Sequence, residues 1–278
     1  MTVLALADAG EAADLAAFLA RLIHYDRAAA VRLQTGGGVL AVFGRPPSFE
    51  VLAIRTARLA APAVAGDDRA GGRSGGAGAA RDRGPERAPA DVPDRAPGRP
   101  SGLGLDITVS AGDLLEGIDE EQGTLTVPAA VTGPPWAGLL PPRGGWQRVP
   151  GLPAPEALLR AVAAAVAEFR ARDEALPPEH RTRAERDRIG REIWSRTLGD
   201  THLPLRAAHA AQSLGFLRPV RTAVLAAGGG RHHTEPPALT LLSAGGWLRL
   251  RTPYGSVAVR TGGPSGLTGL SGLTVTPV

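Results

Sequence analysis

The residues best suited to chemistry lie near the end of the sequence, between positions 245 and 261. Apolar and polar residues alternate there on both sides of a Pro-Tyr-Gly turn, which predicts a β-hairpin with one apolar face and one arginine-bearing face. Arginine beside an exposed tryptophan can hold a phosphate or stack on a base, so this face is a candidate site for nucleic acid or another anion. The alternative is an ordinary solvated surface. The candidate residues are Arg249, Arg251, Arg260, Trp247, Arg218 and Arg221.

A proline-rich segment supplies the second candidate. Trp136 follows one pair of prolines, and Trp146 follows a second pair and two glycines. Because prolines restrict the backbone to irregular extended conformations, these tryptophans can line a groove for a partner protein or belong to a peptide that docks in one. The alternative is that Trp136 and Trp146 pack a long loop onto the rest of the domain.

The six histidines do not suggest a metal site of useful geometry. His202 and His209 lie seven residues apart, which corresponds to about 10 Å along a helix axis. His232 and His233 are adjacent, so their side chains point in opposite directions on an extended chain and make weak metal candidates. Four acids between 116 and 121 lack the ligand spacing of an EF-hand loop. We therefore expect no metal and no cofactor.

Most recognisable catalytic motifs are missing. The sequence contains no cysteine and no lysine, which excludes thiol nucleophiles, Schiff-base lysines and a Walker A loop. It also lacks a Gly-x-Ser-x-Gly elbow and a Gly-x-Gly-x-x-Gly loop between a strand and a helix. Paired carboxylates cannot be chosen from sequence, because any two acids can meet in space. The sequence thus favours a non-enzymatic protein and assigns no catalytic residue.

Composition allows a real core but weakens the significance of the arginines. The chain has 278 residues, of which 43% are hydrophobic and only 4% aromatic. All 31 residues counted as lysine or arginine are arginine, as expected of a bacterial protein with a GC-rich coding sequence. The net charge of +4 is unevenly placed: residues 102–152 carry 2 arginines against 6 acids, and residues 200–278 carry 7 against 2. Either the basic region faces an anionic partner or the two regions neutralise each other.

The first 26 residues lack a basic leader, and no run of about 18 apolar residues occurs. We therefore expect a cytoplasmic protein without a membrane partner.

Periodicity and glycine–proline punctuation predict an α+β fold of antiparallel sheets with a central helical segment. A helix followed by a three-stranded meander indicates an N-terminal α/β module over 1–61. Residues 62–101 have almost no apolar side chains and are expected to form a disordered linker. Residues 102–262 are expected to form an α+β module with three helices, at 155–172, 183–198 and 204–214, and the C-terminal hairpin. Residues 263–278 are expected to be a flexible tail.

Two functions remain open. The absence of catalytic motifs, the linker and the Pro/Trp segment favour a regulatory or scaffolding module that binds another protein. The alternative is a nucleic-acid-binding regulator with a winged-helix-like or β-hairpin surface, because residues 211–227 have part of the spacing of a helix-turn-helix. Residues 218–227 bear on the choice between these functions. Apolar and polar residues alternate there, which favours a strand, whereas a nucleic-acid-binding winged helix needs a recognition helix at this place.

Overall fold

The computed structural model describes residues 2–61, 104–218 and 239–261. Antiparallel sheets and helices make up this part of the chain, which confirms the predicted α+β class. Eight strands form one sheet in the order β5-β2-β3-β4-β11-β10-β9-β8, and a smaller sheet has the order β1-β7-β6. The expected linker at 62–101, the tail at 263–278 and residues 219–227 lie outside the described residues.

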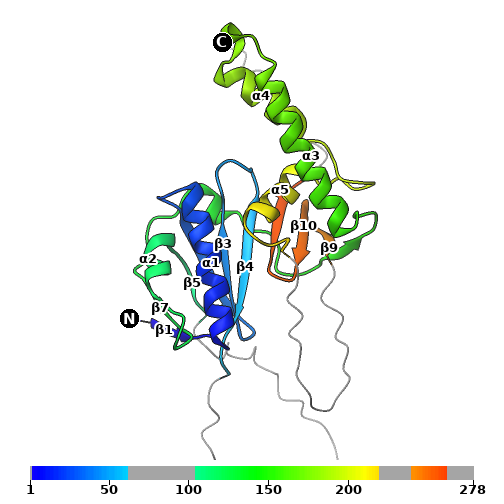
Figure 1. Ribbon diagram of the computed structural model, residues 1–278. Helices are drawn as coiled ribbons and strands as arrows, with labels where there is room; N and C mark the ends of the chain where they lie inside the picture. Colours follow the sequence, from blue (N-terminus) through cyan, green and yellow to red (C-terminus); the bar gives the residue numbers. More distant parts are fainter. Residues whose placement is uncertain (1, 62–103, 219–238, 262–278) are drawn as a thin grey trace, which may run out of the picture.

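The N-terminal half of the large sheet is a meander with α1 packed on it (Figure 1). Asp8 caps α1 by accepting a hydrogen bond from the Glu11 amide at 2.9 Å. The helix then buries an apolar stripe that includes Leu15, Phe18 and Leu22. The elements are β1 (Thr2–Ala5), α1 (Ala9–Tyr25), β2 (Ala30–Gly36), β3 (Val39–Gly44), β4 (Leu52–Arg58), β5 (Asp106–Ser110), α2 (Ala111–Glu116), β6 (Ile118–Asp119) and β7 (Thr124–Val127).

The C-terminal half consists of three α-helices and a second meander. The predicted helices at 155–172, 183–198 and 204–214 correspond to α3, α4 and α5, although α4 ends four residues earlier than expected. The elements are η1 (Pro135–Gly138), β8 (Gln147–Val149), α3 (Pro155–Glu174), η2 (Pro178–His180), α4 (Arg183–Trp194), α5 (Leu205–Ser213), β9 (Thr240–Ala244), β10 (Trp247–Thr252) and β11 (Gly255–Arg260).

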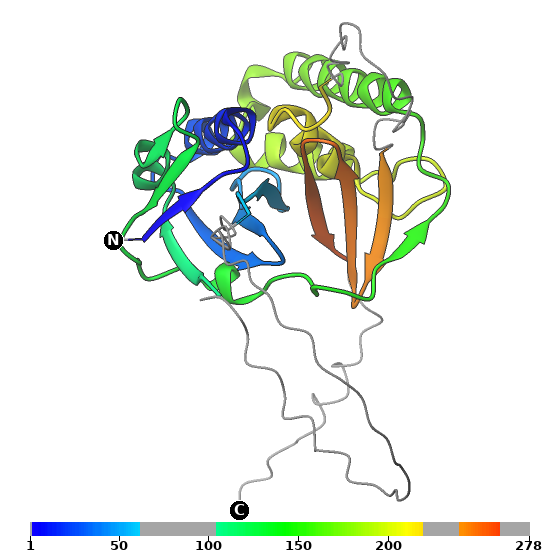
Figure 2. The same cartoon turned by 90° about the horizontal axis from the view of Figure 1, so that it is seen from below.

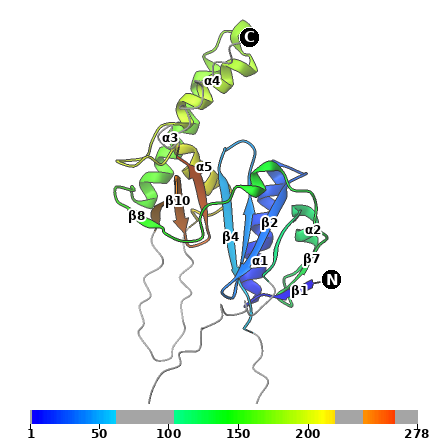
Figure 3. The same ribbon diagram turned by 180° about the vertical axis from the view of Figure 1, so that it is seen from behind.

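Helices α3 and α4 form an arm that projects away from the sheets (Figures 1 and 3). Ion pairs connect the two helices along the arm. Arg172 of α3 binds Glu192 of α4 at 2.7 Å, and Arg186 of α4 binds Asp173 of α3 at 2.7 Å. These contacts hold the helices together where few apolar side chains are buried.

The two halves share one core. Strands β4 and β11 pair in the middle of the large sheet, with Val257 opposite Ala53. Beside this pair, Phe18 of α1 stacks on Phe216, which follows α5, with ring centroids 5.6 Å apart. Residues 104–127, which we expected to belong with the C-terminal module, lie with the N-terminal half because β5 pairs with β2 and β7 pairs with β1.

The two faces of the large sheet are covered differently. Helices α1, α3 and α5 contribute to the main apolar cluster on one face. On the opposite face, residues 128–146 cross from the N-terminal to the C-terminal half beneath the strands (Figure 2). We call these residues the crossing segment. Backbone contacts anchor it to the sheet: the Val131 amide donates to the Thr108 carbonyl at 2.8 Å, and Arg32 donates to the Ala137 carbonyl at 3.1 Å.

Candidate functional site

The predicted tryptophan and arginine candidates gather on the face that the crossing segment covers. Trp247 is buried there in a small apolar cluster with side chains from β3, β4 and β11. Trp136 and Trp146 of the crossing segment are partly buried and pack against this cluster. The two tryptophans therefore attach the crossing segment to the sheet. We define the tryptophan–arginine face as Trp136, Trp146, Arg148, Trp247, Arg249, Arg251 and Arg260.

The strand register places these arginines on one side of the sheet. Trp247 lies directly opposite Arg260 in the β10–β11 pair. Arg148 of β8 and Arg249 of β10 are both opposite Leu242 of β9, so their side chains share one face. Neighbouring strands lie about 4.8 Å apart, so the Cα atoms of Arg148 and Arg249, with β9 between them, are about 10 Å apart across the sheet.

Arg249 has the most constrained guanidinium group of this face. It is partly buried, and its Nε atom donates to the Ser256 hydroxyl at 2.8 Å. Its central carbon lies 5.7 Å from the Trp146 ring centroid, and that of Arg260 lies 5.8 Å from the Trp247 ring centroid. Burial lowers the pKa of Arg249, and the positive charge of Arg251 lowers it further.

No acidic residue occurs in 128–150 or 239–261, the two segments that supply this face. Within the described ranges, no carboxylate lies within ion-pair distance of Arg148, Arg249, Arg251 or Arg260. Asp106 belongs to the acidic region of the sequence but binds Arg32 at 2.8 Å, and this partner lowers the pKa of Asp106. The basic charge of the tryptophan–arginine face is thus not neutralised by the part of the chain that the structure describes.

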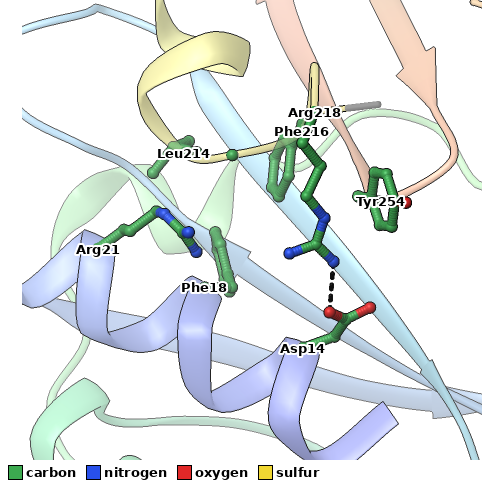
Figure 4. Close-up of a pocket in the computed structure, with 8 residues that line it drawn as sticks. Asp14, Phe18, Arg21, Leu214, Phe216, Arg218 and Tyr254 are labelled. Carbon is green, nitrogen blue, oxygen red and sulfur yellow. Dashed lines mark hydrogen bonds and ion pairs between the residues drawn. The ribbon is translucent and has the colours of Figure 1, made fainter. Parts of the chain in front are cut away.

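Arg218 lies elsewhere, at the joint between the two halves (Figure 4). It forms an ion pair with Asp14 of α1, and its central carbon lies 3.8 Å from the Tyr254 ring centroid. The cavity beside it is about 10 Å³, which is room for a single water molecule. Arg218 therefore connects α1 to the β10–β11 turn. Arg221, His232 and His233 lie outside the described residues.

A buried ion network continues this joint. Arg55 of β4 is only 6% exposed; its Nη2 atom lies 3.1 Å from Glu11 and 3.2 Å from Asp14, and its Nη1 atom donates to the Tyr254 carbonyl at 2.9 Å. The alternation of residues around Arg55 predicts a strand but does not identify its ion partners. The available signal was an arginine within the apolar run from Val51 to Ala57.

His209 is part of a chain of aromatic contacts. It stacks on Trp194 at 4.3 Å between ring centroids and meets the edge of Phe49 at 5.0 Å. Burial lowers its pKa. No group of three or more histidine, aspartate or glutamate side chains able to hold a metal occurs within the described ranges, so His202 and His209 are not joined into such a cluster there.

One groove borders the tryptophan–arginine face. It has a volume of about 460 Å³ and lies where the crossing segment meets the start of β2 and the end of β5. Trp136, Arg45, Asp26 and Ser110 contribute to its walls. This size falls within the range of small-molecule sites, but its lining residues form no set of catalytic groups.

Comparisons with known proteins give two family matches. Residues 1–138 match the model of a domain of unknown function (DUF8010), and residues 141–264 match that of a second domain of unknown function (DUF8185). The boundary between the matches falls inside the crossing segment. No curated protein and no solved structure matches the chain. None of the described helices is both long enough and apolar enough to cross a membrane.

Proposed function

We propose that this protein is a non-enzymatic regulatory or scaffolding module that acts in the cytoplasm and binds another protein through the tryptophan–arginine face. One observation carries the proposal: three of the four tryptophans and four arginines gather on one face from two segments far apart in sequence, and neither segment contains an acidic residue. Arginine is enriched among the residues that dominate binding energy in protein interfaces, and the tryptophans packed beneath these arginines help to hold them in place.

The ionisable groups with shifted pKa values support a binding role over a catalytic one. Active sites are enriched in groups whose pKa is shifted by burial and by specific neighbours. Here each carboxylate with a lowered pKa has an arginine partner that explains the shift, and most lie on the exposed arm. We therefore assign these groups to the stability of the fold.

Affinity purification of the tagged full-length protein from its own host tests this function. One half of each sample is treated with nuclease before capture, and the matched control is the R249Q/R251Q variant. We expect a defined protein partner that survives nuclease treatment and is depleted in the variant. Partners that disappear with nuclease, or that bind the variant equally well, would contradict the proposal.

The second candidate is a nucleic-acid-binding regulator that uses the surface of the β10–β11 hairpin. The observation that favours it is the group of arginines without carboxylate partners among the described residues. Phosphate contacts make affinity fall steeply with salt. This candidate predicts that DNA binding, measured by fluorescence anisotropy, weakens with added salt and when Arg249, Arg251 and Arg260 are changed to alanine. An affinity for DNA that changes neither with salt nor with these substitutions would exclude it.

A further inference from the structure

We propose that the occupant of the tryptophan–arginine face is an extended, carboxylate-rich segment of the partner protein, held chiefly by Arg249 and Arg251. This inference rests on the proposed function and adds the chemistry of the partner. Within the described chain, the charge and the hydrogen-bond donors of Arg249 are only partly satisfied.

Arg249 has donors available to a ligand. A guanidinium group carries five N–H donors, and in the part of the chain that the structure describes only the Nε–H of Arg249 has an acceptor, the Ser256 hydroxyl. Its Nη atoms are not among the fully buried atoms that lack a partner, so they keep some contact with solvent. Two N–H groups of one guanidinium can bind a carboxylate in parallel, and such charge-assisted hydrogen bonds are stronger than neutral ones.

Electrostatics favour an anion at this position. Burial and the charge of Arg251 both disfavour the cationic form of Arg249, although arginine remains protonated. An incoming carboxylate would compensate both effects. Arg148 and Arg260 border the pair and extend the positive field across β8–β11.

The spacing of the arginines fits an extended peptide. Arg249 and Arg251 are two residues apart on β10, which separates their Cα atoms by about 6.8 Å along the strand. An extended partner segment presents same-side carboxylates at the same interval, so two acidic residues separated by one other residue can reach both arginines. Because β10 is an interior strand of the sheet, the Cα positions of the two arginines are fixed before binding.

The tryptophans argue against a nucleic-acid occupant. Base stacking needs an accessible aromatic face. Trp247 is only 8% exposed, Trp136 and Trp146 pack against the sheet, and Arg249 and Arg260 lie over two of the rings. A nucleic acid would bind here through its phosphates but gain no base stacking, whereas an acidic protein segment loses no contact, so it is the better fit.

The test measures binding of a fluorescein-labelled poly-L-glutamate peptide of about 12 residues, about 40 Å long when extended, to the full-length protein by anisotropy. The face variant is R249Q/R251Q. The matched control is R160Q/R170Q, which removes the same charge from two exposed arginines of α3. A second face variant, R148Q/R251Q, changes exposed side chains only and covers the case in which the change at Arg249 disturbs folding. Thermal unfolding checks each chain.

We expect saturable binding by the native protein, weakened about 10-fold or more in R249Q/R251Q, about 3-fold or more in R148Q/R251Q and less than about 2-fold in the control. Equal weakening in face and control variants, no saturable binding, or tighter binding of a single-stranded oligo-dT with the same arginine dependence would overturn the inference. If the peptide fails while nuclease-resistant capture of a protein persists, only this inference falls; if capture also fails, the proposed function falls with it.

Discussion

Arg55 and Arg58 provide a matched comparison of a buried and an exposed ion pair on the same strand. Both side chains bind Glu11 of α1, at 3.1 Å and 2.8 Å respectively. The Arg55 side chain is 8% exposed and the Arg58 side chain 67% exposed. Arg55 also reaches Asp14 and the Tyr254 carbonyl, so it joins the N-terminal half to the β10–β11 turn.

Replacing Arg55 with methionine removes a buried cation that binds the carboxylates of Glu11 and Asp14. Removal of one partner from a buried ion pair costs about 3–5 kcal/mol. The Nε atom of Arg55 has no acceptor among the described residues, so the same change also removes an unsatisfied donor. We therefore expect the lower end, about 3 kcal/mol, which corresponds to a fall in Tm of roughly 6–12 °C for a domain of 150–250 residues. For Arg58→Met we expect a much smaller loss, because an ion pair of an exposed side chain is screened by water.

Urea unfolding followed by circular dichroism measures both variants against the native chain at pH 7. We expect the native chain to have the highest free energy of unfolding. That of Arg58→Met should lie close to it, and that of Arg55→Met well below both. Equal losses for the two variants, or a loss below about 1 kcal/mol for Arg55→Met, would refute the role of Arg55 as the buried joint between the halves.

Three further variants test other parts of the fold. Gly255→Ala would place a Cβ atom 2.6 Å from the Phe216 ring at a φ of 155°, so we expect a loss of about 1–3 kcal/mol in urea unfolding. The pKa of His209 is lowered by burial, so the folded chain binds fewer protons than the unfolded chain and loses stability as pH falls through 6.5; His209→Phe should flatten that part of the stability profile. The Arg172 guanidinium lowers the pKa of Glu192 from 4.5 to about 2, so the ion pair stabilises the arm above pH 4.5 and this contribution is lost as pH falls toward 2. We expect the helicity measured by circular dichroism to fall over this pH range, and to fall less in Glu192→Gln.

Local patterns were sufficient to predict the β10–β11 hairpin of the candidate site, but not the short strand β8 that carries Arg148. Strict alternation placed Leu248 and Leu250 in the main core and put Arg249 on the other face, as the structure shows. The first helix could be predicted because Asp8 has the chemistry of an N-terminal cap and the apolar spacing that follows is helical. These features depend on residues close in sequence.

What covers each face could not be predicted. The register that brings Trp146 beside Arg249 arises from β8 pairing with β9, whose residues lie nearly a hundred positions apart. The partners of Arg55 lie on α1 and on the β10–β11 turn, and nothing in local periodicity connects them. For the same reason residues 104–127 could not be assigned to the N-terminal half: antiparallel pairing of β5 with β2 is a non-local choice.

Site-specific photo-crosslinking in the native host tests the central claim most directly. A photoreactive amino acid in place of Arg148 lies on the tryptophan–arginine face and leaves Arg249, Arg251 and Arg260 intact; the same amino acid in place of Arg170 lies on the arm and serves as the control. We predict a discrete protein adduct from position 148, lost when R249Q/R251Q is added, and none from position 170. Nucleic-acid adducts from position 148, or protein adducts from both positions alike, would contradict a protein-binding role for this face.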